Sequence, residues 1–63
     1  MKNKISYLRL KEGFTQKELA NKLSITTSHF GMIETGVRNP SLKLAYKISK
    51  IFNTTIESIF FEI

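Results

Sequence analysis

Apolar residues recur at intervals of three and four positions along most of the chain, a spacing that predicts short amphipathic helices. We expect five helices, over residues 2–12, 16–23, 27–35, 42–52 and 56–60. Gly13, Gly36 and Pro40 interrupt the helical pattern and are typical of the turns between helices. The last residues, Phe61-Glu62-Ile63, alternate apolar and polar side chains as a strand does. The pattern predicts an all-α chain of five helices with a possible short C-terminal β-strand.

Residues that cap helices stand at the expected starts. Thr15 is followed three positions later by Glu18, which is the spacing of a capping box. Thr26, Ser41 and Thr55 precede the third, fourth and fifth helices and can cap them in the same way. Helical spacing turns the following side chains toward a common core: Ile5, Leu8, Leu19, Ala20, Leu23, Phe30, Ile33, Leu42, Ala45, Ile48 and Phe52.

Length and composition narrow the classes of function. With 63 residues, the chain is expected to form a single domain over 1–63. It has no Cys, and His29 is the one histidine, so neither a metal site nor a cofactor is expected. A single histidine without an evident pair of carboxylates offers few catalytic groups, so we predict that the protein is not an enzyme. The short chain also leaves little room for a small-molecule pocket.

The charge balance points to a polyanion. The chain has ten Lys and Arg residues but five Asp and Glu residues. This positive excess favours a nucleic acid as partner, although a basic soluble domain would show the same excess. The basic start MKNKI is not followed by an apolar segment, and no run of residues is long and apolar enough to cross a membrane. We therefore expect a cytoplasmic protein.

Three motifs connect the pattern to a family. They are T-Q-x-E-L-A at residues 15–20, I-E-x-G at 33–36 and N-P-S-L at 39–42, with the tight turn Leu23-Ser24-Ile25 between two helices. Together they resemble the phage-repressor/Cro-like (Xre) helix-turn-helix family, and the match runs without a gap from Leu8 to Phe60. The resemblance implies a lambda-repressor-like five-helix fold, a helix-turn-helix over about 16–23 and 27–35, and binding to double-stranded DNA. It also implies that a bacterium, a phage or a plasmid encodes the protein.

The resemblance also implies which residues read bases. Thr26, Thr27, Ser28 and Met32 occupy positions at which relatives meet base edges in the major groove, and short hydroxyls can bond to several bases. None of the ten Lys and Arg lies on this helix. Phosphate binding is a separate task, which cations on the flanks can perform. His29 is left open between a DNA contact and a simply exposed residue. Gly31 is left open between allowing a close approach and being merely tolerated.

The expected phosphate contacts surround this helix. Gln16 matches a family position that touches a phosphate, and the start of a helix favours an anion; the alternative is a solvated residue at the start of a helix. The other candidates, each of which could instead be an ordinary solvated side chain, are Lys17, Arg38, Asn39 and Lys43. Arg9 and Glu34 match a pair that forms a salt bridge between the first and third helices in some relatives, and we interpret them as scaffold.

Apolar side chains at the C-terminal end predict a two-fold dimer through the fourth helix, the fifth helix and the tail. The expected interface residues are Leu44, Ile51, Ile59, Phe61 and Ile63. The alternative is a monomer whose tail folds back on itself.

The function these expectations favour is a sequence-specific transcriptional regulator, a repressor, that binds a near-palindromic operator as a homodimer. Its half-sites would lie about one helical turn, roughly 10 base pairs, apart. The alternative is a protein-interaction module, such as an antitoxin-like protein that binds a partner through the same fold.

Overall fold

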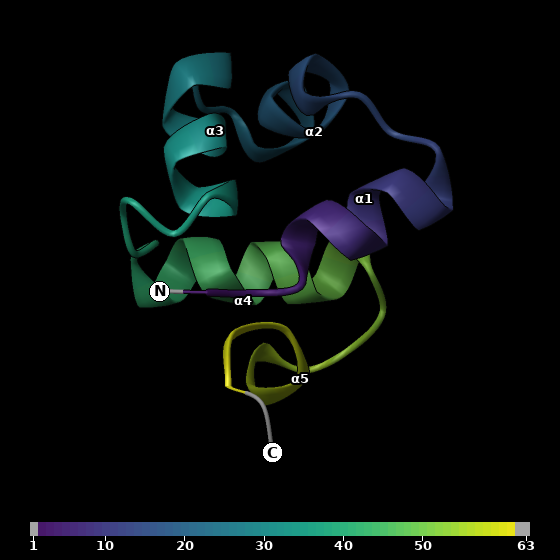
Figure 1. Cartoon of the computed structure of the whole chain (residues 1–63), viewed down its shortest axis with the longest axis vertical. Coiled ribbons are helices and arrows are strands. Elements are labelled where there is room, and N and C mark those ends of the chain that lie inside the picture. The colour runs from purple at the N-terminus through teal and green to yellow at the C-terminus, as the bar shows by residue number, and fades with distance from the viewer. Residues whose placement is uncertain (1, 62–63) are drawn as a thin grey trace.

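The computed structural model describes residues 2–61, and within this range the chain is all-helical, as predicted (Figure 1). The helices are α1 (Ile5–Glu12), α2 (Gln16–Leu23), α3 (Thr27–Glu34), α4 (Leu42–Ile51) and α5 (Ile56–Phe60). The α2–α3 pair lies above α4, and α5 lies on the other side of α4. No strand forms in the described range, and two of the three residues of the predicted strand lie outside it.

Hydroxyl side chains begin four of the five helices. The Thr15 hydroxyl accepts a bond from the Glu18 N–H at 3.0 Å, and the Thr15 N–H donates to the Glu18 carboxylate at 2.8 Å, so the predicted capping box is present. Each bond satisfies an N–H that a helix start leaves without a partner. The caps predicted at Thr26, Ser41 and Thr55 are present too.

Left-handed residues separate the helices. Gly13 ends α1 with φ 79° and Gly36 follows α3 with φ 83°, a conformation that glycine adopts without a steric penalty. Asn53 has φ 53° and follows the end of α4. Ser24 also has a positive φ, 59°, which the sequence pattern did not indicate. This residue turns the chain between α2 and α3 and so sets the direction of α3.

The start of α1 differs from the prediction, because the helix begins at Ile5 rather than near Lys2. Residues 3 and 4 make other contacts. The Asn3 side chain donates to the Ile33 carbonyl at 2.9 Å and accepts from the Ile5 N–H at 3.0 Å. The Lys4 N–H donates to the Ile59 carbonyl at 2.9 Å. These bonds tie the segment before α1 to the end of α3 and to α5.

One core receives side chains from all five helices. The most completely buried side chains are Ile5, Leu19, Phe30, Ile33, Ile48 and Ile59. Burying each of these large apolar groups contributes about 1.5–3 kcal/mol before the entropy of ordering is counted. The ring of Phe14 meets that of Phe52 edge to face, with centroids 6.5 Å apart, and partly covers the core.

The inward face of α4 is rotated from the predicted one. Leu42 was expected inside but is 78% exposed, whereas Leu44 is buried. The buried face consists of Leu44, Ala45, Ile48 and Ser49, and Leu42 lies outside that arc. Ser49 is tolerated there because its hydroxyl donates to the Tyr46 carbonyl at 2.7 Å. Because Ser49 counts as polar, the apolar pattern did not predict which face of α4 is buried.

Two of the residues expected at an exposed dimer interface belong to this core. Leu44 and Ile59 are buried within the chain, and Ile51 is half-buried against the core. Burial inside one chain leaves Leu44 and Ile59 little side-chain surface for contact with a second copy. Phe61 is 50% exposed, and Ile63 lies outside the described residues. No helix in residues 2–61 is both long and apolar enough to cross a bilayer.

Candidate nucleic-acid interface

The α2–α3 turn places one face of α3 on the surface. Thr27 and Ser28 are exposed in its first turn, and Met32 is 38% exposed one turn further on. Phe30 and Ile33 anchor the opposite face in the core. The helix thus presents short hydroxyls and a thioether to the outside while its apolar face fixes its orientation.

Thr26 has a second task. Its hydroxyl caps α3 by accepting a bond from the His29 N–H at 3.0 Å. The capping bond uses one lone pair and leaves the hydroxyl proton and a second lone pair available. Thr26 is therefore held in place as part of the helix start, whereas the exposed side chains of Thr27 and Ser28 make no such capping bond.

Glu34 connects three helices below this face. It accepts a bond from Arg9 Nε of α1 at 2.7 Å and from Gln16 Nε2 of α2 at 2.6 Å. Arg9 also donates to the Phe14 carbonyl at 2.9 Å. The ion pair expected between Arg9 and Glu34 is present, with side chains 14% and 5% exposed. Gln16 joins this network, which the sequence did not indicate, and is therefore oriented before any ligand arrives.

Gly31 lies on α3 close to Gln16. A methyl group added at this position would come within 3.9 Å of Gln16 Nε2, which is an ordinary van der Waals distance. The backbone of Gly31 is not in the left-handed region. Nothing inside the folded chain therefore requires a glycine here.

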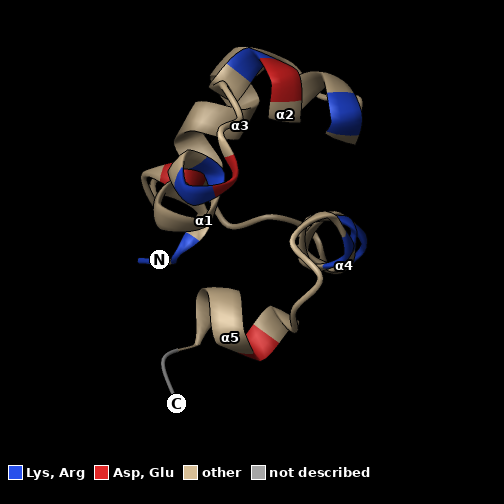
Figure 2. Ribbon diagram, turned by 90° about the vertical axis from the view of Figure 1, so that its right-hand side faces the viewer, with Lys and Arg blue, Asp and Glu red and all other residues tan. Residues whose placement is uncertain are grey.

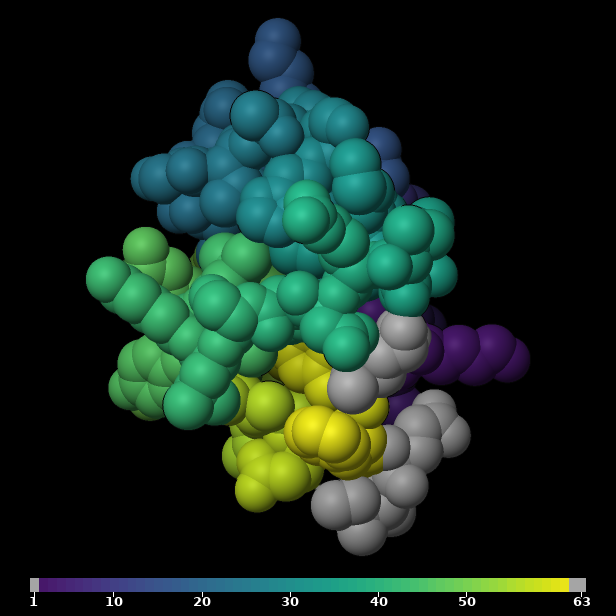
Figure 3. Space-filling model, turned by 90° about the vertical axis from the view of Figure 1, so that its left-hand side faces the viewer, coloured from purple at the N-terminus to yellow at the C-terminus, as the bar shows by residue number. Residues whose placement is uncertain are grey.

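No Lys or Arg lies on α3, whereas the neighbouring helices α2 and α4 carry several (Figure 2). Lys17 is exposed on α2, Arg38 and Asn39 are exposed in the α3–α4 loop, and Lys43 is exposed on α4. The Arg38 N–H donates to the Met32 carbonyl at 3.1 Å, which holds the loop against the end of α3. Figure 3 shows α3, the loop and the start of α4 on one face of the molecule. Positive groups thus stand beside a surface that carries only neutral side chains.

Two features of this region escaped the sequence prediction. Lys47 follows Lys43 by one helical turn, and both line a hollow between α3 and α4 together with His29. The spacing of four residues between the two lysines is a signal that could have indicated a basic stripe on α4.

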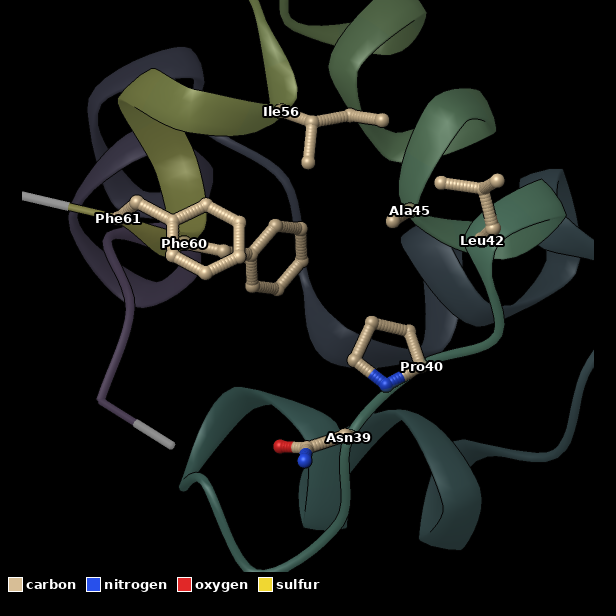
Figure 4. Close-up of a pocket in the computed structure, with 7 residues that line it drawn as sticks. All are labelled: Asn39, Pro40, Leu42, Ala45, Ile56, Phe60 and Phe61. Carbon is tan, nitrogen blue, oxygen red and sulfur yellow. The ribbon is translucent and has the colours of Figure 1, made fainter.

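The second feature is an uncharged groove between the first half of α4 and α5 (Figure 4). It has a volume of about 240 Å³, and none of its lining residues is charged. Leu42 and Ala45 of α4 lie on one side of it, and Phe60 and Phe61 lie on the other. Leu42, which the apolar pattern had placed in the core, lines this groove instead.

Comparison with known proteins identifies the family. Residues 5–59 match the helix-turn-helix family. An HTH-type transcriptional regulator of Methanocaldococcus jannaschii is 48% identical over 60 residues, which are 95% of this chain and 91% of that protein. The HTH-type transcriptional regulator YgzD of Bacillus subtilis is 40% identical, over 95% of this chain and 91% of the relative.

Solved structures support the same family. The crystal structure of SinR, the master regulator for biofilm formation, in complex with DNA has a TM-score of 0.75 and 27% sequence identity, and the match covers 86% of this chain and 87% of that one. The N-terminal DNA-binding domain of SinR from Bacillus subtilis gives a TM-score of 0.73 with 28% identity, over 84% and 78% of the two chains. The chain therefore belongs to the helix-turn-helix family of Cro/C1-type (Xre) DNA-binding transcriptional regulators.

Proposed function

We propose that this protein is a sequence-specific transcriptional repressor that inserts α3 into the major groove of a near-palindromic operator. The observation that carries the proposal is the exposed face of α3, which is neutral and is bordered by cations on α2, the α3–α4 loop and α4. Phosphate contacts position such a protein, and base contacts specify its site. The likeness to SinR, whose crystal structure is a complex with DNA, supports DNA as the ligand.

In this proposal Thr27, Ser28 and Met32 contact base edges, together with the Thr26 side chain at the start of the helix. Hydroxyls donate and accept bonds to several bases, and the Thr methyl group can touch the methyl group of thymine. Bidentate contacts of Arg or Gln, worth about 1–3 kcal/mol each, are missing from this face. Specificity then has to come from several modest contacts, from the shape of the DNA and from two half-sites read together.

Gln16, Lys17, Arg38, Asn39 and Lys43 hold phosphates on the two sides of the groove. Gln16 is suited to this because the bond from its amide to Glu34 fixes the side chain at the start of α2. Each lysine or arginine that neutralises a phosphate steepens the fall of affinity with salt, by about 0.9 in the log–log slope. We expect a steep salt dependence for the same reason.

The repressor acts as a homodimer that closes the uncharged groove of α4 and α5. Leu42 and Phe61 are the exposed apolar side chains at its rim, and a two-fold contact would place each copy's pair against the other's groove. An uncharged surface is suited to this in a chain of net charge +5, because two copies repel each other elsewhere. A Leu42→Asp variant should sediment as a monomer where the parent protein is a dimer, and a variant that remains dimeric would disprove this interface.

Selection of bound duplexes from a random DNA library tests base reading. The parent protein is compared with a Thr27→Ala, Ser28→Ala double variant and with Thr54→Ala, which removes a hydroxyl between α4 and α5. We expect a two-fold motif that the double variant loses or changes and that Thr54→Ala retains. If no protein selects a motif at moderate salt, α3 does not read bases. A partner protein would then be sought for this surface and for the groove.

A further inference from the structure

A hollow of about 270 Å³ lies between the first half of α3 and the first half of α4. It has room for several water molecules, each of which occupies about 30 Å³ in the liquid. The floor is apolar and the rim is basic or hydroxylic. The lining residues are Leu23, Ile25, His29, Ser41, Lys43, Leu44 and Lys47.

The two lysines of the rim lack a negative partner in the hollow. Lys43 and Lys47 stand one turn apart on α4, so their charges repel each other modestly. No carboxylate lines the hollow, and the ion pair found among residues 2–61 joins Arg9 to Glu34 at another site. In Figure 2 the basic residues of α4 lie along one side of that helix. An anion entering the hollow would relieve the repulsion and meet two cations at once.

His29 reaches the same hollow from α3. It is half-buried, and the rotation of 100° per residue directs it toward α4, away from the arc of Thr27 and Gly31. Its backbone N–H bonds to Thr26, but no hydrogen bond of the described residues uses its imidazole ring. The ring nitrogens therefore remain available to a ligand in the hollow.

We propose that this hollow holds one backbone phosphate of bound DNA between His29, Lys43 and Lys47, and that DNA binding is therefore coupled to uptake of a proton by His29. The inference rests on the proposed function and adds a residue and a pH dependence to it. A phosphodiester only accepts hydrogen bonds, so an imidazolium, with a donor at each nitrogen, suits it better than neutral imidazole.

The direction of the pH effect follows from the charges around the ring. In the free protein His29 faces Lys43 and Lys47 of α4, while the α2–α3 turn contributes only the uncharged Leu23 and Ile25 to the hollow. A phosphate bound between the three side chains favours the charged imidazolium over the neutral ring. The complex then holds more protons than the separate molecules, so affinity falls as the pH rises, by at most about tenfold per pH unit for one proton.

Fluorescence anisotropy with a labelled duplex, from about pH 5.5 to 8.5 at constant ionic strength, tests the coupling. We expect the Kd of the parent protein to rise at least about fivefold across this range, within the one-proton limit. His29→Gln should bind with a flat pH profile, and His29→Lys should keep tight binding at the alkaline end. Lys47→Gln should lower the salt slope by about one, as the loss of a phosphate contact does.

Lys50→Gln is the matched control on the same helix. The Lys50 ammonium lies 5.2 Å from the centroid of the Tyr46 ring and does not line the hollow, so this variant should keep the pH dependence of the parent protein. Circular dichroism at both ends of the pH range establishes that each variant is folded. A parent protein and a His29→Gln variant with the same pH profile would overturn the inference.

Further outcomes distinguish a DNA phosphate from a free anion in the hollow, and a failure of this inference from a failure of the proposed function. Inorganic phosphate is titrated without DNA while the NMR signals of the His29 ring are followed. Saturation by inorganic phosphate, combined with no pH coupling of DNA binding, would assign the hollow to a free anion and overturn the DNA contact. If no duplex binds at any pH or salt, the proposed function itself fails. If duplexes bind without coupling, only the present inference fails.

Discussion

Replacing Gly31 by alanine should make the protein more stable and a poorer DNA binder. Glycine in the middle of a helix costs about 0.5–1 kcal/mol relative to alanine, because the unfolded chain loses more freedom on folding. The added methyl group would lie 3.9 Å from Gln16 Nε2, without a clash. The whole gain should therefore appear in the free energy of unfolding. For a domain of this size it corresponds to a rise in Tm of about 2–8 °C.

Thermal and urea unfolding, followed by circular dichroism, measure this change. Protein concentration is held constant, because the Tm of a self-associating protein depends on it. Gly13→Ala is the matched control. Open space surrounds its Cβ position, but its φ of 79° strains an L-residue, so it should lose about 1 kcal/mol. The reasoning is refuted if Gly31→Ala is destabilised, or if both variants shift in the same direction.

The DNA affinity of the Gly31→Ala variant is then measured by fluorescence anisotropy with a labelled duplex. Gly31 follows Thr27 by four residues and therefore shares its exposed face of α3. If α3 enters the major groove, the methyl group holds the helix away from the bases, and affinity should fall although stability rises. Stability and affinity that rise together would show that this face does not approach DNA closely.

Other substitutions address the scaffold and the groove. Glu34→Gln should lower the free energy of unfolding by about 3 kcal/mol in urea titrations, because Arg9 stays largely buried without its partner charge. Thr15→Ala, which removes the capping box, should cost about 1 kcal/mol in the same assay. Leu44→Ala should cost about 2–5 kcal/mol because it leaves a cavity in the core. Leu42→Ser should change the stability of the monomer by less than about 0.5 kcal/mol while weakening dimerisation, as measured by sedimentation.

The sequence predicted what depends on local chemistry. Caps such as Thr15 and turns such as Gly13 act within a few residues, so their pattern is visible in the sequence and their positions agree with the structure. The charged pair of Arg9 and Glu34 was predictable only through the resemblance to a family, since 25 positions separate the two residues.

What the sequence could not predict depends on packing between distant segments. The start of α1 is set by bonds of Asn3 and Lys4 to α3 and α5, which no local pattern encodes. The rotation of α4 follows from the burial of Ser49, a residue that the apolar pattern counts as polar. The hollow at His29 likewise forms only because α3 and α4 pack side by side, which no local pattern predicts. Roles in DNA binding remain predictions that the proposed variants test.

The bond between the Lys4 N–H and the Ile59 carbonyl has a consequence for biosynthesis. It joins segments near opposite ends of the described chain, and Ile59 and Phe60 beside it belong to the core. A ribosome adds about 5–20 residues per second from the N-terminus onward, so α1 to α4 are synthesised before these residues exist. The nascent chain must carry its apolar faces uncovered until Phe60 has emerged. Folding is therefore completed only after α5 has left the ribosome, and a transcript broken before codon 59 yields a chain without a closed core.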